Sequence, residues 1–153
     1  MTEPDLGVLV ALAYQEFVRE MHEDLAGRGF DDLGRSDGYV FRALDAGPLT
    51  TSALAVRLDI TKQGAGQLVE DMTRRGYLTR RADPSDRRAR LLELSERGRA
   101  ALTAARAFHR SYESRLARRH GRAQVDSFRA MLVAMAPTYG RGALDPRVRA
   151  MHV

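Results

Sequence analysis

Two short helices joined by almost no linker constrain the fold of this chain most. Thr50 is a strong candidate N-cap, and apolar residues follow it at helical spacing for two turns. Only Asp59 and Ile60 come before Thr61, which can cap a second helix that runs to Gly76. Two helices separated by so short a turn form a helix–turn–helix unit.

A hairpin is expected directly after this unit. Short strand candidates at 77–80 and 91–94 flank a charged loop, which predicts two antiparallel strands. Helical spacing predicts further helices at 6–25, from the N-cap Ser36 to Gly47, from the N-cap Ser95 over 96–119, and at 123–136. This order is that of a winged helix–turn–helix, whose second helix enters the DNA major groove. We therefore predict a mainly α fold with a small β-hairpin wing.

Composition narrows the class of protein. The chain has 153 residues, of which 44% are hydrophobic and 29% charged, as in a globular protein. A net charge of +5 favours a polyanionic partner. The absence of cysteine excludes disulfides and thiolate sites. No apolar run approaches the roughly 20 residues of a membrane span, and the N-terminus does not resemble a signal peptide, so we expect a cytoplasmic protein.

The hairpin loop carries the most specific motif. It reads Asp83-Pro84-Ser85-Asp86-Arg87-Arg88, and the strand after it leads into Leu94-Ser95 and Gly98. This pattern resembles the MarR family of bacterial transcription regulators, which has an Asp-Pro-x-Asp-(Arg/Lys)-Arg wing and a Leu-(Thr/Ser)-x-x-Gly start to its long helix. Matching helices extend the resemblance to about residues 5–137.

The resemblance implies an obligate homodimer held by the first and last helices, with two winged lobes on palindromic double-stranded DNA. It also implies that a small-molecule pocket often lies between lobe and dimer core. We accordingly predict a helical dimerisation region at 1–30 and 96–137, a DNA-binding lobe at 34–95 and a loose C-terminal tail at 138–153. Candidate dimer contacts are Leu9, Phe17, Phe128 and Leu132.

The wing has a physical interpretation of its own. Asp86 and Arg88 stand two apart on a tight loop, so the carboxylate can fix the guanidinium as a pre-oriented fork for a narrow minor groove. The resemblance assigns Arg88 to the minor groove, with Asp86 as its buttress. Arg87 and Arg90 would reach phosphates, which add affinity without sequence information. The alternative is a solvated turn whose ion pairs contribute little.

The second helix of the unit begins with an exposed polar turn. Its candidate DNA contacts are Thr61, Lys62, Gln63, Gly64, Gly66 and Gln67. Glutamine can pair with adenine, and lysine can reach guanine or phosphate. Glycine costs about 1 kcal/mol against alanine inside a helix, so Gly64 and Gly66 favour close approach of the backbone to DNA. Sequence drift and packing against another helix are the alternatives.

Other polar residues border this surface. The preceding helix opens with three hydroxyl residues that can hold a phosphate, although capping explains the first equally well: Thr50, Thr51 and Ser52. Four arginines flank the first strand and either extend the basic face or are simply solvated: Arg74, Arg75, Arg80 and Arg81.

A ligand pocket is also conceivable. Aromatic and basic residues of the first two helices can line a cleft for an aromatic anion: Tyr14, Phe17, Met21, His22, Tyr39 and Arg42. Core or dimer packing explains each of them too.

No catalytic set is visible, and the four histidines lack metal-ligand spacing, so we predict neither an enzyme nor a cofactor nor a metal site. The leading hypothesis is a dimeric, sequence-specific DNA-binding regulator, a repressor of a nearby operon that a small ligand can release. The alternative is a winged-helix protein that makes protein–protein or nonspecific nucleic-acid contacts.

Overall fold

The computed structural model describes residues 4–86 and 88–136. The elements in chain order are α1 (Leu6–Gly27), α2 (Asp37–Asp45), β1 (Leu49–Thr50), α3 (Thr51–Leu58), α4 (Lys62–Arg74), β2 (Leu78–Ala82), β3 (Arg90–Leu94), α5 (Glu96–His120) and α6 (Arg122–Met135). Two predicted features, Arg87 and the tail at 138–153, lie outside the described residues. None of the helices in the described ranges is both long and apolar enough to cross a membrane.

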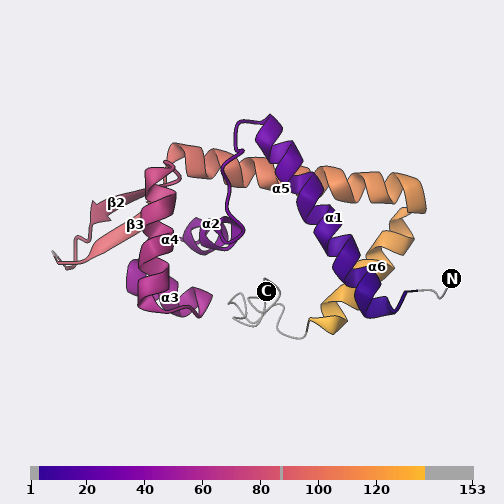
Figure 1. Cartoon of the computed structure of the whole chain (residues 1–153), viewed down its shortest axis with the longest axis horizontal. Helices are drawn as coiled ribbons and strands as arrows, with labels where there is room; N and C mark the ends of the chain where they lie inside the picture. The colour runs from indigo at the N-terminus through magenta and orange to yellow at the C-terminus, as the bar shows by residue number, and fades with distance from the viewer. Residues whose placement is uncertain (1–3, 87, 137–153) are drawn as a thin grey trace.

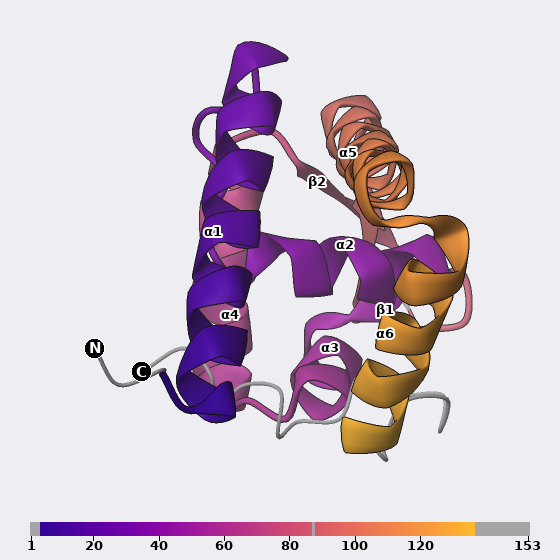
Figure 2. The same cartoon turned by 90° about the vertical axis from the view of Figure 1, so that its right-hand side faces the viewer.

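The long helix α5 joins two parts of the molecule. At one end, α2, α3, α4 and the sheet form a compact lobe (Figure 1). At the other end, α1 packs across α5, and α6 turns back from the end of α5. Figure 2 shows α1 and α6 on opposite sides of the molecule in that view. The predicted winged helix–turn–helix with added helices is confirmed.

The wing is a sheet of three antiparallel strands in the order β1-β3-β2, not a hairpin alone. Leu49 pairs with Leu92 and Thr50 with Leu91, so the segment before α3 adds a strand to the hairpin. The prediction missed β1 because two residues are too short to show the alternation that identifies a strand. The hairpin strands β2 and β3 also extend one or two residues further toward the tip than predicted.

Side-chain caps fix where three helices begin. The hydroxyls of Thr50, Thr61 and Ser95 accept hydrogen bonds from backbone N–H groups three residues later, at 3.0–3.1 Å. The expected cap at Ser36 is wrong, since its side chain makes no capping bond and its backbone is already helical. Instead the Asp37 carboxylate accepts from the backbone N–H of a residue before the helix, as described below.

The lobe has one apolar core. Its fully buried side chains come from α2, α3, α4, the sheet and the turn between α4 and β2: Tyr77, Leu54, Met72, Leu92, Val40 and Val69. Gly76 ends α4 with φ +81°, a conformation that favours glycine. Gly98 lets α5 approach the start of the wing, because a Cβ there would lie 2.2 Å from the Tyr77 carbonyl oxygen.

Candidate functional site

The helix α4 buries one face and exposes the other. Ala65, Val69 and Met72 are completely buried in the core. The predicted contact residues therefore fall on the outer face of its first turns, where Thr61, Lys62, Gln63 and Gln67 are exposed and Gly64 and Gly66 are half-buried. The structure thus presents the predicted set as one polar surface at the N-terminal half of α4.

The two glycines of this surface have different surroundings. A Cβ at Gly66 would meet nothing within 4 Å among the described residues, so no neighbouring helix requires a glycine there. A Cβ at Gly64 would lie 3.1 Å from the capping oxygen of Thr61. Packing against another helix, one of the alternatives for these glycines, is therefore excluded for the part of the chain described.

Not all three hydroxyl groups at the start of α3 are available to bind a phosphate. The Thr50 side-chain oxygen is already the N-cap, accepting from the Ala53 N–H at 3.1 Å. Thr51 is half-buried and Ser52 is exposed. A phosphate contact at this helix start stays a prediction that rests mainly on Ser52 and the neighbouring backbone.

Two aspartates organise the tip of the wing. Asp83 accepts from the Ser85 backbone N–H at 2.8 Å and from the Ser85 hydroxyl at 2.7 Å. These bonds hold the pKa of Asp83 below its usual value. Asp86 accepts from the backbone N–H of Arg88 at 2.9 Å, and its own carbonyl accepts from the Ala89 N–H at 3.0 Å. The tip is thus a hydrogen-bonded turn.

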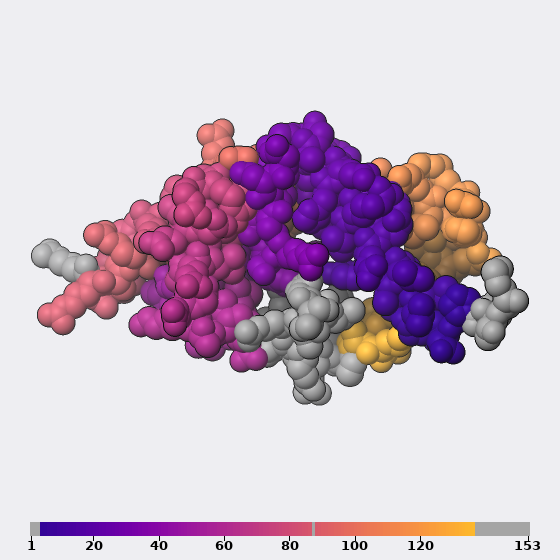
Figure 3. All heavy atoms as spheres, viewed as in Figure 1, coloured from indigo at the N-terminus to yellow at the C-terminus, as the bar shows by residue number. Residues whose placement is uncertain are grey.

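This geometry corrects the expected pairing of Asp86 with the Arg88 guanidinium. An aspartate two residues before another residue on a tight turn reaches that residue's backbone N–H more readily than its long side chain. The carboxylate therefore sets the direction of the chain, and the Arg88 and Arg90 side chains remain exposed. Figure 3 shows the hairpin projecting from the lobe beside α3 and α4.

The four arginines around the first wing strand do not form one basic face. Arg74 pairs with Asp71 at 2.5 Å, and Arg81 pairs across the sheet with Glu93 at 2.6 Å. Arg80 is exposed. Arg75 points inward, with a side chain only 17% exposed, so both of its predicted roles, basic face and solvated charge, are wrong.

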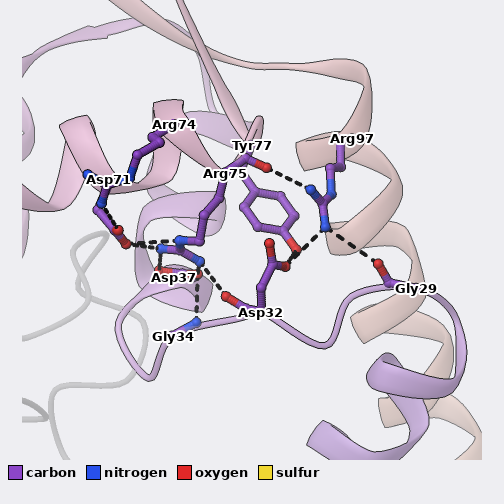
Figure 4. Close-up of polar contacts among 9 residues, drawn as sticks. All are labelled: Gly29, Asp32, Gly34, Asp37, Asp71, Arg74, Arg75, Tyr77 and Arg97. Atoms are coloured by element: carbon purple, nitrogen blue, oxygen red, sulfur yellow. Dashed lines mark hydrogen bonds and ion pairs between the residues drawn. The ribbon is translucent and has the colours of Figure 1, made fainter.

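Arg75 is the centre of a polar junction behind α4 (Figure 4). Its guanidinium donates to both carboxylate oxygens of Asp37, at 2.6 and 3.2 Å, and to the Asp32 carbonyl at 2.7 Å. It also donates to Asp71 Oδ2 at 2.9 and 2.5 Å. Asp37 accepts in addition from the Gly34 N–H at 2.8 Å. The carboxylates of Asp37 and Asp71 hold the pKa of Arg75 above its usual value.

A second set of bonds ties the loop between α1 and α2 to the wing and to α5. The Tyr77 hydroxyl donates to the Asp32 carboxylate, and Arg97 donates to the same carboxylate at 3.0 Å and to the Arg75 carbonyl at 2.7 Å. The Arg97 guanidinium lies 4.6 Å from the centre of the Tyr77 ring. Burial raises the pKa of Tyr77 to about 12, and the Asp32 carboxylate adds to this shift.

No local pattern in the sequence predicts this junction. Asp32 and Asp37 bind partners 38 or more residues away in the chain. The feature that distinguishes Asp37 is the burial of its charged side chain. Burial depends on the folded structure, so the amino-acid sequence alone does not reveal it.

A cavity of about 590 Å³ lies between α1, α2 and α5. All six predicted pocket residues line it: Tyr14, Phe17, Met21, His22, Tyr39 and Arg42. Asp37 and His109 contribute to the wall as well. Burial lowers the pKa of His109, and the nearby Arg42 lowers it further. The wall thus combines aromatic rings with cationic side chains and one buried carboxylate.

The predicted dimer contacts separate into two groups. Leu9, Phe128 and Leu132 are exposed, and their role as dimer contacts stays a prediction. Phe17 turns inward, and its ring centre lies 5.5 Å from that of Phe108 and 4.9 Å from that of Tyr112. Phe17 therefore belongs to the cavity wall and an aromatic cluster of its own chain.

Comparisons with known proteins agree with this architecture. Residues 31–89 match the model of the MarR family. Among solved structures, RV1404 from Mycobacterium tuberculosis superposes with a TM-score of 0.74 at 19% identity, over 92% of this chain and 98% of that one. YusO from Bacillus subtilis gives 0.69 at 17% identity, over 87% and 93%. A mutant of S. aureus MepR bound to an oligodeoxyribonucleotide gives 0.64 at 19% identity, over 89% and 99%. A search of curated proteins found no match.

Proposed function

We propose that the chain is a transcription regulator of the MarR family, whose model matches residues 31–89 in the winged lobe, and that it acts as a dimeric, sequence-specific DNA-binding repressor. A small ligand in the cavity would release it from DNA. A chromosomal operator as target implies a cytoplasmic location.

The observation that carries the proposal is the arrangement of the lobe. The first turns of α4 expose Lys62, Gln63 and Gln67 while the opposite face is locked into the core. The wing projects beside this helix with Arg88 and Arg90 exposed. A recognition helix in the major groove and an arginine in the adjacent minor groove need these two features side by side. The MepR structure with a bound oligonucleotide supports the same use of the fold.

Dimer formation is supported by apolar surface at the other end of the molecule. Large apolar side chains are exposed on both terminal helices: Leu6, Val8, Leu9 and Leu12 on α1, and Phe128, Met131, Leu132, Val133 and Met135 on α6. Clusters of this kind mark interaction sites, because isolated soluble monomers rarely expose them. A second copy of the chain would place two winged lobes on one palindrome, as the two-fold symmetry of a dimer requires.

The cavity supports release by a ligand. It contacts α1 on one side and α2 of the winged lobe on the other, so its occupancy can affect how the two parts sit together. Aromatic rings, the cationic Arg42 and the imidazole of His22 suit a small aromatic or anionic molecule.

Two arginine variants test the DNA-binding role. Arg88→Ala should weaken binding to a selected operator and reduce the preference for A·T pairs at its flanks, because a minor-groove arginine reads groove width. Arg90→Ala should weaken all duplexes alike and lower the salt slope by about one, as expected for a single phosphate contact. The measurement is in vitro selection from a random library, followed by titrations at several salt concentrations.

The same selection distinguishes the competing function. Identical sequence profiles for the wild type and Arg88→Ala would contradict the minor-groove role. A wild type that enriches no sequence would favour a winged-helix protein with nonspecific nucleic-acid or protein contacts.

A further inference from the structure

The guanidinium of Arg75 has no spare donor. An arginine has five N–H groups, and here five hydrogen bonds end on Asp37, Asp71 and the Asp32 carbonyl. These acceptors belong to the first turn of α2, the last turn of α4 and the α1–α2 loop. Arg75 itself is the residue immediately after α4. A shift of any one of the three segments must therefore break or lengthen a bond to this one group.

One of these acceptors is also part of the cavity wall. Asp37 is only 1% exposed, yet it lines the cavity together with Gly34, whose N–H it binds at 2.8 Å. A molecule bound against this wall would contact the 34–37 segment. A displacement of that segment would act on the Asp37–Arg75 pair, because Gly34 and Arg75 hold the carboxylate at the same time.

We propose that Arg75 is the positioning residue through which occupancy of the cavity moves the recognition helix α4. The proposal rests on the proposed function, since it gives the route by which a bound ligand would release DNA. A displaced Asp37 pulls the guanidinium away from Asp71, and the end of α4 then loses the contact that fixes its direction relative to α2.

The chain provides a matched control beside this residue. Arg74 also pairs with Asp71, but its side chain is 73% exposed and it is not among the described residues that line the cavity. Lysine keeps the charge at either position while losing the planar fork that reaches several acceptors together. Arg75→Lys therefore breaks the connection between Asp37 and Asp71. Arg74→Lys makes the same chemical change at a residue that does not contact Asp37.

The experiment measures coupling between cavity and operator. The probe is 8-anilinonaphthalene-1-sulfonate, an aromatic anion of a size suited to the cavity. The operator Kd is measured with and without saturating probe for the wild type, Arg75→Lys, Arg74→Lys and Asp37→Asn. Circular dichroism and thermal unfolding identify any variant that does not fold. Coupling between two sites typically changes affinity by about 5- to 150-fold.

We expect the probe to raise the operator Kd of the wild type and of Arg74→Lys by at least about fivefold. In folded Arg75→Lys and Asp37→Asn, both probe and operator should still bind, with a mutual effect below about twofold. A residue that merely stabilised the fold would change unfolding without removing this coupling.

Three results would overturn the proposal. Coupling in Arg75→Lys or Asp37→Asn equal to the wild-type value would exclude the route, and so would a probe that does not affect the wild-type operator Kd. Loss of coupling in Arg74→Lys as well would show that any change near Asp71 suffices. Failure of the proposed function differs from all three, because the wild type would then not prefer the operator over a scrambled duplex even without probe.

Discussion

Replacing Gly66 by alanine separates DNA contact from sequence drift in the recognition helix. Gly66 is the fifth residue of α4, and a Cβ there meets nothing within 4 Å among the described residues. Alanine in a helix interior is favoured over glycine by about 1 kcal/mol, so the free energy of unfolding should rise by about that amount. Operator binding should weaken, because an added methyl group in a tight contact costs about 1–3 kcal/mol, or roughly 5- to 150-fold in Kd.

Two further glycines serve as matched controls. Gly64→Ala places its Cβ 3.1 Å from the Thr61 capping oxygen, and because such a cap contributes about 1 kcal/mol, the helical gain should largely disappear. Gly38 lies in α2, away from the proposed DNA surface, and its Cβ also meets open space among the described residues. Gly38→Ala should therefore leave operator Kd unchanged.

Urea unfolding and an operator titration on these three variants distinguish close backbone approach to DNA from sequence drift. A more stable Gly66→Ala protein with unchanged operator Kd would refute close backbone approach and leave drift as the explanation. A less stable Gly66→Ala protein would refute the geometry of α4 itself.

Two other predictions follow from the junction of α5 with the wing. Gly98→Ala should lower the free energy of unfolding by about 1–3 kcal/mol or more, because its Cβ would lie 2.2 Å from the Tyr77 carbonyl oxygen; an unchanged urea midpoint would contradict this close approach. Between pH 10 and 12 the unfolded state loses the Tyr77 proton before the folded state does, since the folded pKa is about 12, so stability should fall with rising pH by at most about 1.4 kcal/mol per unit. Tyr77→Phe should remove the contribution of Tyr77 to that slope, and equal slopes in both proteins would contradict the raised pKa of Tyr77 in the folded state.

Local sequence signals predicted the helices and the exposed polar face of α4. Thr50, Thr61 and Ser95 were identified as caps from residue type and position alone, because a cap depends only on the next three residues. Apolar periodicity likewise fixed which side of α4 faces the core, and so which residues of its first turns are exposed.

Local sequence signals do not predict contacts between residues that are far apart in the chain. Arg75 was expected on the surface, yet its partners Asp32 and Asp37 lie about forty positions earlier in the chain. The expected partner of the Asp86 carboxylate is the Arg88 guanidinium, but the carboxylate accepts from the Arg88 backbone N–H. Which of the two groups it reaches depends on the backbone conformation of the turn. Phe17 was expected at a dimer contact, but the approach of α5 turned it toward Phe108.

Footprinting of purified protein on the DNA upstream of its own gene tests the central claim most directly. A dimeric regulator should protect one palindrome, with two half-sites about 10 base pairs apart from centre to centre and one dimer bound per site. Protection that grows in proportion to DNA length, without a preferred palindrome, would contradict the account.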